Sequence, residues 1–252
     1  MELLYNKNIT IFGDSIAKGV FLNNLKIQKI TPNAAEIVED NFGVKITNNS
    51  MFGQTLKRIY EKGIIENYIL NINPFQKNLA VIALGGNDSD YCWEEVEKLP
   101  NYSHSPKTML FEYDQMLNDI IQKLKANNVQ VVVCSLFPID SNRYFNNVLA
   151  KKYDSQKIME FFNGDITNIA RHQEIFNIEC MKIALKNGCE FLDYRSQLLN
   201  LRNFLDYLCD DGIHPNQMGQ KFIAEYITQK ICEKEKYHFC IPNLQLNHAR
   251  KV

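Results

Sequence analysis

The sequence predicts a three-layer α/β domain with a mainly parallel sheet. Five short apolar runs, rich in β-branched residues, recur along the chain, and stretches with helical spacing separate them. Each run is continuously apolar, which is typical of strands covered by helices on both faces. A length of 252 residues suits one such domain or two small ones, and no segment has the composition of a linker. We therefore expect a single domain over residues 1–252, with residues from about 237 to 252 as a C-terminal extension beyond the last helix.

The predicted strands alternate with helices whose ends can be read from the residue types. The apolar runs, in chain order, are Ile9–Phe12, Val44–Thr47, Leu79–Leu84, Val129–Cys134 and Glu190–Leu192. Thr31 and Pro32 predict the start of a helix, as an N-cap followed by proline in the first turn, and Gly43 predicts its end. Helical spacing predicts a second helix that contains residues 110–124 and a third over about residues 165–187.

The charge balance excludes several classes of function. Lys and Arg total 28 against 29 for Asp and Glu, so the net charge of −1 would attract neither nucleic acid nor an anionic membrane. No run of about 18 apolar residues could cross a bilayer. Residues 1–7 lack the basic and apolar regions of a secretory signal, so we expect a cytoplasmic protein.

Cysteine usage and short motifs argue against a bound metal or cofactor. Seven cysteines occur without a Cys-x-x-Cys pair, which argues against both a disulfide framework and a zinc ribbon. The sequence contains no His-Glu-x-x-His motif and no glycine-rich phosphate-binding loop. We therefore expect reduced thiols, no metal and no cofactor.

A candidate nucleophile follows the first apolar run, where the chain turns at Gly13-Asp14-Ser15. The turn after a strand exposes the Ser15 hydroxyl, which needs a nearby base because a hydroxyl by itself is a weak nucleophile. On its own, this tripeptide is also an ordinary strand-to-helix turn in which Asp14 or Ser15 caps the helix.

A candidate base and its partner lie just before the last predicted helix. Asp211 and His214 are three residues apart at a turn, and Pro215 suits the first helical position. An imidazole that accepts a proton through one nitrogen needs the other held by an acceptor, which Asp211 would provide. The alternative is that His214 caps the helix and Asp211 forms the turn.

Two further turns offer hydrogen-bond donors. Gly53 follows the second predicted strand, and Gly85-Gly86-Asn87-Asp88 follows the third. A glycine lets the backbone present its N–H to a ligand, and an asparagine amide can donate to a developing oxyanion. Each segment is also a common turn composition.

Taken in order, these four segments resemble the sequence blocks of the SGNH hydrolase superfamily, also called GDSL-type hydrolases. The blocks correspond to Gly13-Asp14-Ser15, Gly53, Gly85-x-Asn87-Asp88 and Asp211-x-x-His214, and the resemblance extends from residue 9 to the last helix. It implies a flavodoxin-like fold with strand order 2-1-3-4-5. It also implies that Ser15 is the nucleophile, His214 the base and Asp211 its orienting partner, with an oxyanion hole of Ser15, Gly53 and Asn87.

The remaining candidate residues would bind substrate. Aromatic residues are concentrated in the insertion from 88 to 107 and after the fourth predicted strand, and both segments leave the same edge of the sheet. The residues expected to contact substrate are Asp14, Phe52, Asp88, Tyr91, Trp93 and Phe137. Packing of these loop residues on the core is the alternative.

We therefore expect a serine esterase or acylhydrolase that cleaves carboxylic esters of small acylated carbohydrates or lipids through an acyl-serine intermediate. An α/β-hydrolase is disfavoured because Ser15 follows the first strand and because Asp211 and His214 share one loop. A non-catalytic module that binds an acylated sugar or lipid, an acyltransferase and a thioesterase are the alternatives. The expected partner is a small-molecule ester, and the sequence does not predict an oligomeric state.

Overall fold

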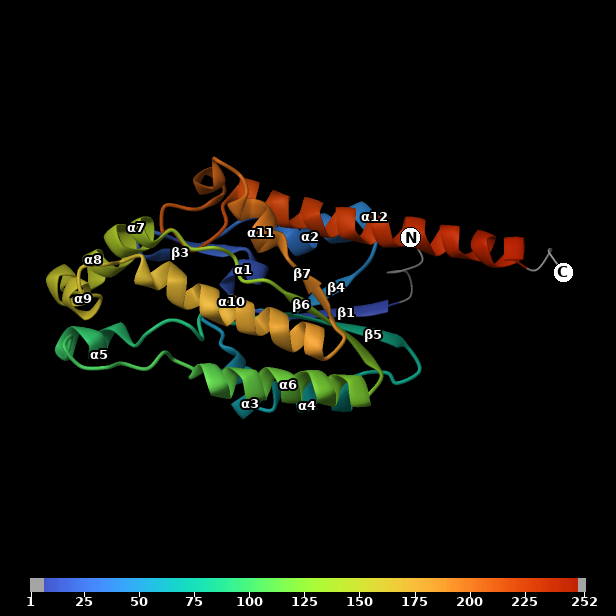
Figure 1. Ribbon diagram of the computed structural model, residues 1–252, viewed down its shortest axis with the longest axis horizontal. Helices are drawn as coiled ribbons and strands as arrows, with labels where there is room; N and C mark the ends of the chain where they lie inside the picture. Colours follow the sequence, from blue (N-terminus) through green and yellow to red (C-terminus); the bar gives the residue numbers. More distant parts are fainter. Residues whose placement is uncertain (1–6, 249–252) are drawn as a thin grey trace.

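A parallel sheet lies between two layers of helices (Figure 1) in the computed structural model, which describes residues 7–248, with side chains described as far as Lys234. The strands are β1 (Lys7–Gly13), β2 (Val20–Asn23), β3 (Lys26–Lys29), β4 (Ile46–Asn48), β5 (Lys77–Ala83), β6 (Val129–Cys134) and β7 (Glu190–Leu192). The helices are α1 (Ser15–Lys18), α2 (Ala34–Phe42), α3 (Leu56–Glu61), α4 (Ile64–Asn71), α5 (Trp93–Lys98), α6 (Leu110–Ala126), α7 (Ser141–Tyr144), the π-helix η1 (Phe145–Leu149), α8 (Ala150–Lys152), α9 (Ser155–Phe161), α10 (Asn168–Lys186), α11 (Tyr194–Leu199), the 3-10 helix η2 (Phe204–Tyr207) and α12 (Gln217–His248).

The central sheet has the strand order β4-β1-β5-β6-β7, and every neighbouring pair is parallel. Numbered within this sheet alone, the order is 2-1-3-4-5, so the expected fold class is confirmed. The sequence analysis did not predict the separate antiparallel hairpin of β2 and β3. Its turn contains Asn24 and Leu25, both with positive φ. Leucine rarely adopts this conformation, so its presence in the sequence does not predict a turn.

Alternate residues of the strands enter opposite layers, which explains why the apolar runs are continuous. Phe12, Ile82 and Val133 pack in a core with α3, α4, α6 and α10. Ile9 and Val132 pack in a second core with α2, α11 and α12 on the other face of the sheet. Figure 1 shows the two helical layers on either side of the strands. The carboxyl ends of all five strands therefore meet at one edge, where the loops are free to form a site.

Two predicted helix starts are wrong by two residues. The N-cap of α2 is Asn33, whose side chain accepts hydrogen bonds from the backbone of Ala35 and Glu36, while the Glu36 carboxylate accepts from the backbone of Asn33. This reciprocal capping box stabilises the helix start more effectively than the Thr31-Pro32 pair that we predicted. Gly43, in a left-handed conformation, ends α2 as predicted.

The last helix also differs from the prediction at both ends. Pro215 precedes α12 by two residues, and the side chain of Asn216 caps the helix by accepting from the backbone of Gly219 at 3.1 Å. We expected an extension beyond the last helix from Tyr237 onward, but α12 continues to His248. Residues 249–252 lie outside the described residues. Among the described helices, none is both long and apolar enough to cross a membrane.

A third apolar cluster covers the carboxyl edge of the sheet. It joins α5, which lies within the insertion of residues 88–107, to the helices from α7 to α9. Trp93 and Tyr144 are its central aromatic residues. Within the side chains that the structure describes, the free thiols are Cys92, Cys134, Cys180, Cys189, Cys209 and Cys232.

The two candidate caps of α2 can be compared directly by mutation. We expect Asn33→Ala to lower the free energy of unfolding by about 1 to 2 kcal/mol, because it removes the acceptor of two helix N–H groups. Thr31→Ala is the matched control and should change this free energy by less than about 0.5 kcal/mol, because Thr31 is exposed. Urea unfolding followed by circular dichroism measures both, and equal losses would contradict the assignment of Asn33 as the cap.

Candidate active site

Ser15 lies at the carboxyl end of β1, as the first residue of α1. The Asp14 side chain caps this short helix by accepting the Ile16 N–H at 2.9 Å. Gly13 is required by the close packing around the turn, because a Cβ there would lie 2.6 Å from the Ala17 Cβ. The turn therefore fixes the direction in which the serine hydroxyl points.

Three side chains form a continuous hydrogen-bonded chain. His214 Nε2 lies 2.9 Å from Ser15 Oγ, and His214 Nδ1 lies 2.7 Å from Asp211 Oδ2. An ionised Asp211 accepts the proton of Nδ1, which leaves Nε2 free to accept the serine proton. The predicted base, His214, therefore contacts the predicted nucleophile, Ser15, which is 199 residues away in the sequence. Asp211 in turn contacts His214.

Backbone donors hold Asp211 as a carboxylate. Its Oδ1 accepts from the N–H groups of Ile213 and His214 at 3.0 Å, and its Oδ2 accepts from the N–H of Leu22 at 2.8 Å. Burial is the largest single influence on the pKa of Asp211 and raises it. The hydrogen bond to His214, the charge of His214 and the backbone donors together lower the pKa by more than burial raises it. The net pKa lies below the usual value, so the group is ionised at neutral pH.

The loop that carries Asp211 and His214 is packed closely against the start of α7. Gly212 has a φ of 75°, and a Cβ there would lie 2.6 Å from the backbone nitrogen of Tyr144. Its carbonyl accepts the Asp140 N–H at 2.8 Å, and the His214 carbonyl accepts the Cys209 N–H at 2.8 Å. This packing fixes the imidazole in line with Ser15.

Three hydrogen-bond donors line the same cavity as Ser15. Gly53 has a φ of 67°, and the Asn87 amide is oriented by donating to the Gln54 carbonyl at 3.0 Å. Within residues 7–248, the backbone N–H groups of Ser15 and Gly53 donate to no protein acceptor. These two N–H groups and the second hydrogen of the Asn87 amide are therefore free to bind an oxyanion.

The cavity over Ser15 has a volume of about 620 Å³ and mixed aromatic and polar walls. The ring of Phe52, which is 39% exposed, stacks on the His214 ring with centroids 6.2 Å apart. Tyr91 and Trp93, which also line the cavity, form an edge-to-face pair. Below them, Asp90 accepts from the Trp93 indole N–H at 2.9 Å and from the Lys107 ammonium at 2.6 Å.

A sequence comparison decides the family. The sequence pattern of the GDSL-like lipase/acylhydrolase family matches residues 11–222, which include Ser15, Gly53, Asn87, Asp211 and His214. The chain belongs to this family. It is accordingly a carboxylic ester hydrolase, as we expected. No protein of curated function matches the sequence.

Solved structures support the fold of this acylhydrolase. A protein of the lipolytic G-D-S-L family from Veillonella parvula is 17% identical, with a TM-score of 0.60, and the match covers 88% of this chain and 97% of that one. A lipase/acylhydrolase from Enterococcus faecalis is 17% identical, with a TM-score of 0.53, over 90% and 96% of the two chains. A mutant acetyl-xylooligosaccharide esterase from Geobacillus is 16% identical, with a TM-score of 0.59, over 90% and 94%.

Two residues that we expected to contact substrate in this acylhydrolase are structural. Asp88 is 0% exposed, and it accepts from the Leu56 N–H at 2.9 Å and from the Thr108 hydroxyl at 2.6 Å. It therefore holds the start of α3 against the chain that leads to α6. Phe137 is 1% exposed and packs in the core with α11 and α12. Phe52, Tyr91 and Trp93 do line the catalytic cavity, and so does Asp14.

The sequence analysis missed the hairpin of β2 and β3 as part of the site. Leu25 and Ile27 lie at the rim of the cavity, and Leu22 donates to the catalytic acid candidate. Asp90 and Lys107 were also missed as cavity residues, although both lie in the insertion that we expected to form a wall. No group of three or more His, Cys, Asp or Glu side chains among the described residues could hold a metal ion.

Asp14 provides a test of the electrostatics beneath Ser15. Burial raises the pKa of Asp14 to about 6, while the bond from the Ile16 N–H and the charge of His214 oppose the rise. Because the unfolded carboxyl titrates near pH 4, the folded protein gains stability from the proton on Asp14 below about pH 4 and loses it as the pH rises through about 6.

We expect Asp14→Asn to remove this loss while keeping an acceptor for the cap. Relative to the wild type, the variant should gain up to about 3 kcal/mol of unfolding free energy between about pH 4 and about pH 8. Urea unfolding at several pH values measures this difference. A difference that does not change with pH would show that Asp14 keeps its ordinary pKa in the folded protein.

Proposed function

We propose that the protein is a serine esterase in which Ser15 attacks the ester carbonyl. The observation that carries the proposal is the hydrogen-bonded chain from Asp211 through His214 to Ser15, at 2.7 and 2.9 Å. His214 takes the serine proton as the new C–O bond forms, and Asp211 stabilises the resulting imidazolium. The carbonyl oxygen becomes an oxyanion that accepts from Ser15, Gly53 and Asn87.

The same groups complete the acylation of Ser15 and then hydrolyse the acyl-serine. His214 protonates the departing alcohol, and the bond between that alcohol and the acyl carbon breaks. A water molecule then gives its proton to His214 and attacks the acyl-serine, so that the carboxylic acid leaves and Ser15 regains its proton. Another alcohol in place of water would give acyl transfer by the same steps.

The walls of the cavity favour an acylated carbohydrate as substrate. Tyr91 and the exposed ring of Phe52 offer aromatic surface for a sugar ring, and Asp90 and Lys107 in the same cavity offer groups that bind hydroxyls. One solved relative is named an acetyl-xylooligosaccharide esterase, which supports this class. Lipid esters are the second class that the apolar rim at Leu25 fits.

The reaction is tested with p-nitrophenyl acetate and its longer-chain homologues, beside acetylated xylo-oligosaccharides. We expect turnover in the wild type and a loss of at least about a thousandfold in Ser15→Ala, because the variant lacks the hydroxyl that His214 would activate. Ser103→Ala, at an exposed serine, is the matched control and should keep full activity. Ligand binding without turnover in the wild type would instead support a non-catalytic module.

The oxyanion hole is tested by Asn87→Ala. Loss of one preorganised donor typically costs about 3 to 4 kcal/mol of transition-state stabilisation, so kcat should fall a hundredfold or more with little change in KM. Asn101→Ala, at an exposed asparagine, controls for the substitution itself. Wild-type turnover by Asn87→Ala, on an ester whose chemical step limits the rate, would remove Asn87 from the oxyanion hole.

A further inference from the structure

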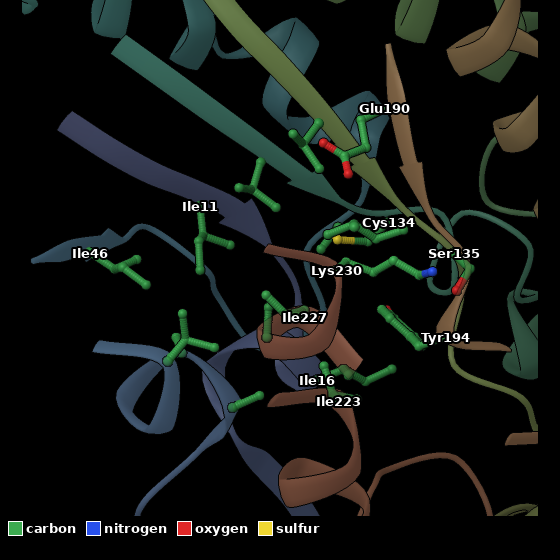
Figure 2. A pocket seen from close by; sticks show the side chains of 18 of the residues that line it. Ile11, Ile16, Ile46, Cys134, Ser135, Glu190, Tyr194, Ile223, Ile227 and Lys230 are labelled. Carbon is green, nitrogen blue, oxygen red and sulfur yellow. The ribbon is translucent and has the colours of Figure 1, made fainter. Parts of the chain in front are cut away.

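A second cavity runs beneath the sheet, on the face covered by α2 and α12 (Figure 2). Its volume is about 180 Å³. In Figure 2, Ile11 and Cys134 on the strands lie across the hollow from Ile223 and Ile227 on α12. The lining includes neither Ser15 nor His214, so this cavity is distinct from the catalytic one.

The floor of this cavity is a set of aliphatic side chains on one face of the sheet. Because side chains alternate along a strand, every second residue of the central strands points into it. These residues are Ile9 and Ile11 on β1, Leu79, Val81 and Ala83 on β5, and Val132 and Cys134 on β6. Ile223, Ile227 and Ile231 of α12 form the roof. The hollow is therefore apolar along most of the strand length.

The same alternation places polar side chains at the amino ends of the strands. Lys7 and Gln130 stand at the start of their rows, and the Lys7 ammonium donates to the Gln130 carbonyl oxygen at 2.7 Å. Glu190, on β7, forms an ion pair with Lys234 of α12. The amino end of the cavity is thus polar and its middle is aliphatic, while Asp14, Ser135 and Gln173 line it at the carboxyl end.

Positive charge exceeds negative charge at this polar end. Lys7 and Lys234 line the cavity there with Glu190, and Lys77 lies beside Lys7 in the register of β1 and β5. The ammonium of Lys230 points instead toward Ser135 (Figure 2). Lys230 is paired with Glu233 at 2.8 Å, and Lys234 is paired with Glu190. Burial lowers the pKa of Lys7 most, the charges of Lys77 and Lys234 lower it further, and the charge of Glu190 raises it. An anionic group bound at this end would reduce the repulsion among Lys7, Lys77 and Lys234.

We propose that the cavity binds an unbranched alkyl carboxylate, with its tail between the sheet and α12 and its carboxylate beside Lys7 and Lys234. An apolar cavity of about 150 Å³ is large enough to bind benzene, so 180 Å³ accommodates an alkyl segment of roughly six to eight carbons. The aliphatic lining stabilises the tail by removing it from water, and the lysines select an acid over an alcohol or an amine.

This site extends the function of the protein beyond ester cleavage. Asp14 and Gly86 line both cavities, so the far end of the alkyl site lies directly behind the turn that carries Ser15. The proposal requires no reaction and does not depend on Ser15 being the nucleophile. Binding can therefore be measured separately from turnover.

The test is titration calorimetry with octanoate on matched valine variants. Val132→Phe places a ring in the alkyl cavity, and Val148→Phe places the same ring in the catalytic cavity. We expect octanoate to bind the wild type and Val148→Phe with similar Kd, and to bind Val132→Phe at least about tenfold more weakly. Circular dichroism and melting temperature establish that each variant is folded. Ile227→Phe, which fills the cavity from α12, replaces Val132→Phe should that variant fail to fold.

The polar end is tested by comparing ligands that carry a carboxylate or an alcohol on the same alkyl chain. Lys7→Gln should weaken octanoate at least about threefold and leave the weaker binding of 1-octanol unchanged, because only the acid uses the ammonium. Three results would overturn the proposal. They are no binding of any acid from hexanoate to dodecanoate, equal affinity in the wild type and both alkyl-cavity variants, and loss of binding only in Val148→Phe.

Discussion

The pairing of β1 with β5 determines where every other functional group can lie. These two strands run parallel from Lys7 beside Lys77 to Gly13 beside Ala83, in the middle of the sheet. Since they end together, the turn that carries Ser15 and the turn that carries Asn87 leave the same edge. The β4 strand pairs with the other side of β1 and delivers Gly53 to that edge. A parallel register, with both faces buried, thus converts three separate loops into one site.

The parallel sheet follows from patterns that a single sequence contains, whereas the order of its strands was expected from the resemblance to the SGNH hydrolases. Burial on two faces favours apolar residues at most strand positions, and β6 and β7 begin and end at the predicted residues. The candidate site residues Ser15 and Asn87 could also be predicted, because both stand just beyond predicted strands. His214 and Asp211 were found through their spacing before a predicted helix. In each case a local pattern and the functional chemistry coincide.

What could not be predicted depends on contacts between distant segments. Asp88 has the residue type and position of a substrate ligand, but the free N–H groups at the start of α3 bind it instead. Phe137 follows a strand end, yet the arrival of α12 buries it. In the hairpin of β2 and β3, β3 is exposed throughout and gives no burial pattern, and the Leu22 N–H joins the hairpin to Asp211. Only the assembled fold distinguishes these outcomes.

The bond from Leu22 to Asp211 has an evolutionary consequence. Its donor is a backbone N–H, so every side chain except proline at position 22 leaves it intact. Residues in this hairpin can therefore change to suit different substrates at the rim of the cavity, while the main chain continues to orient the acid. Relatives that share the mechanism would then differ freely in the sequence of this segment. Variation between relatives would then suggest that the hairpin is dispensable, although its backbone holds the Asp211 carboxylate.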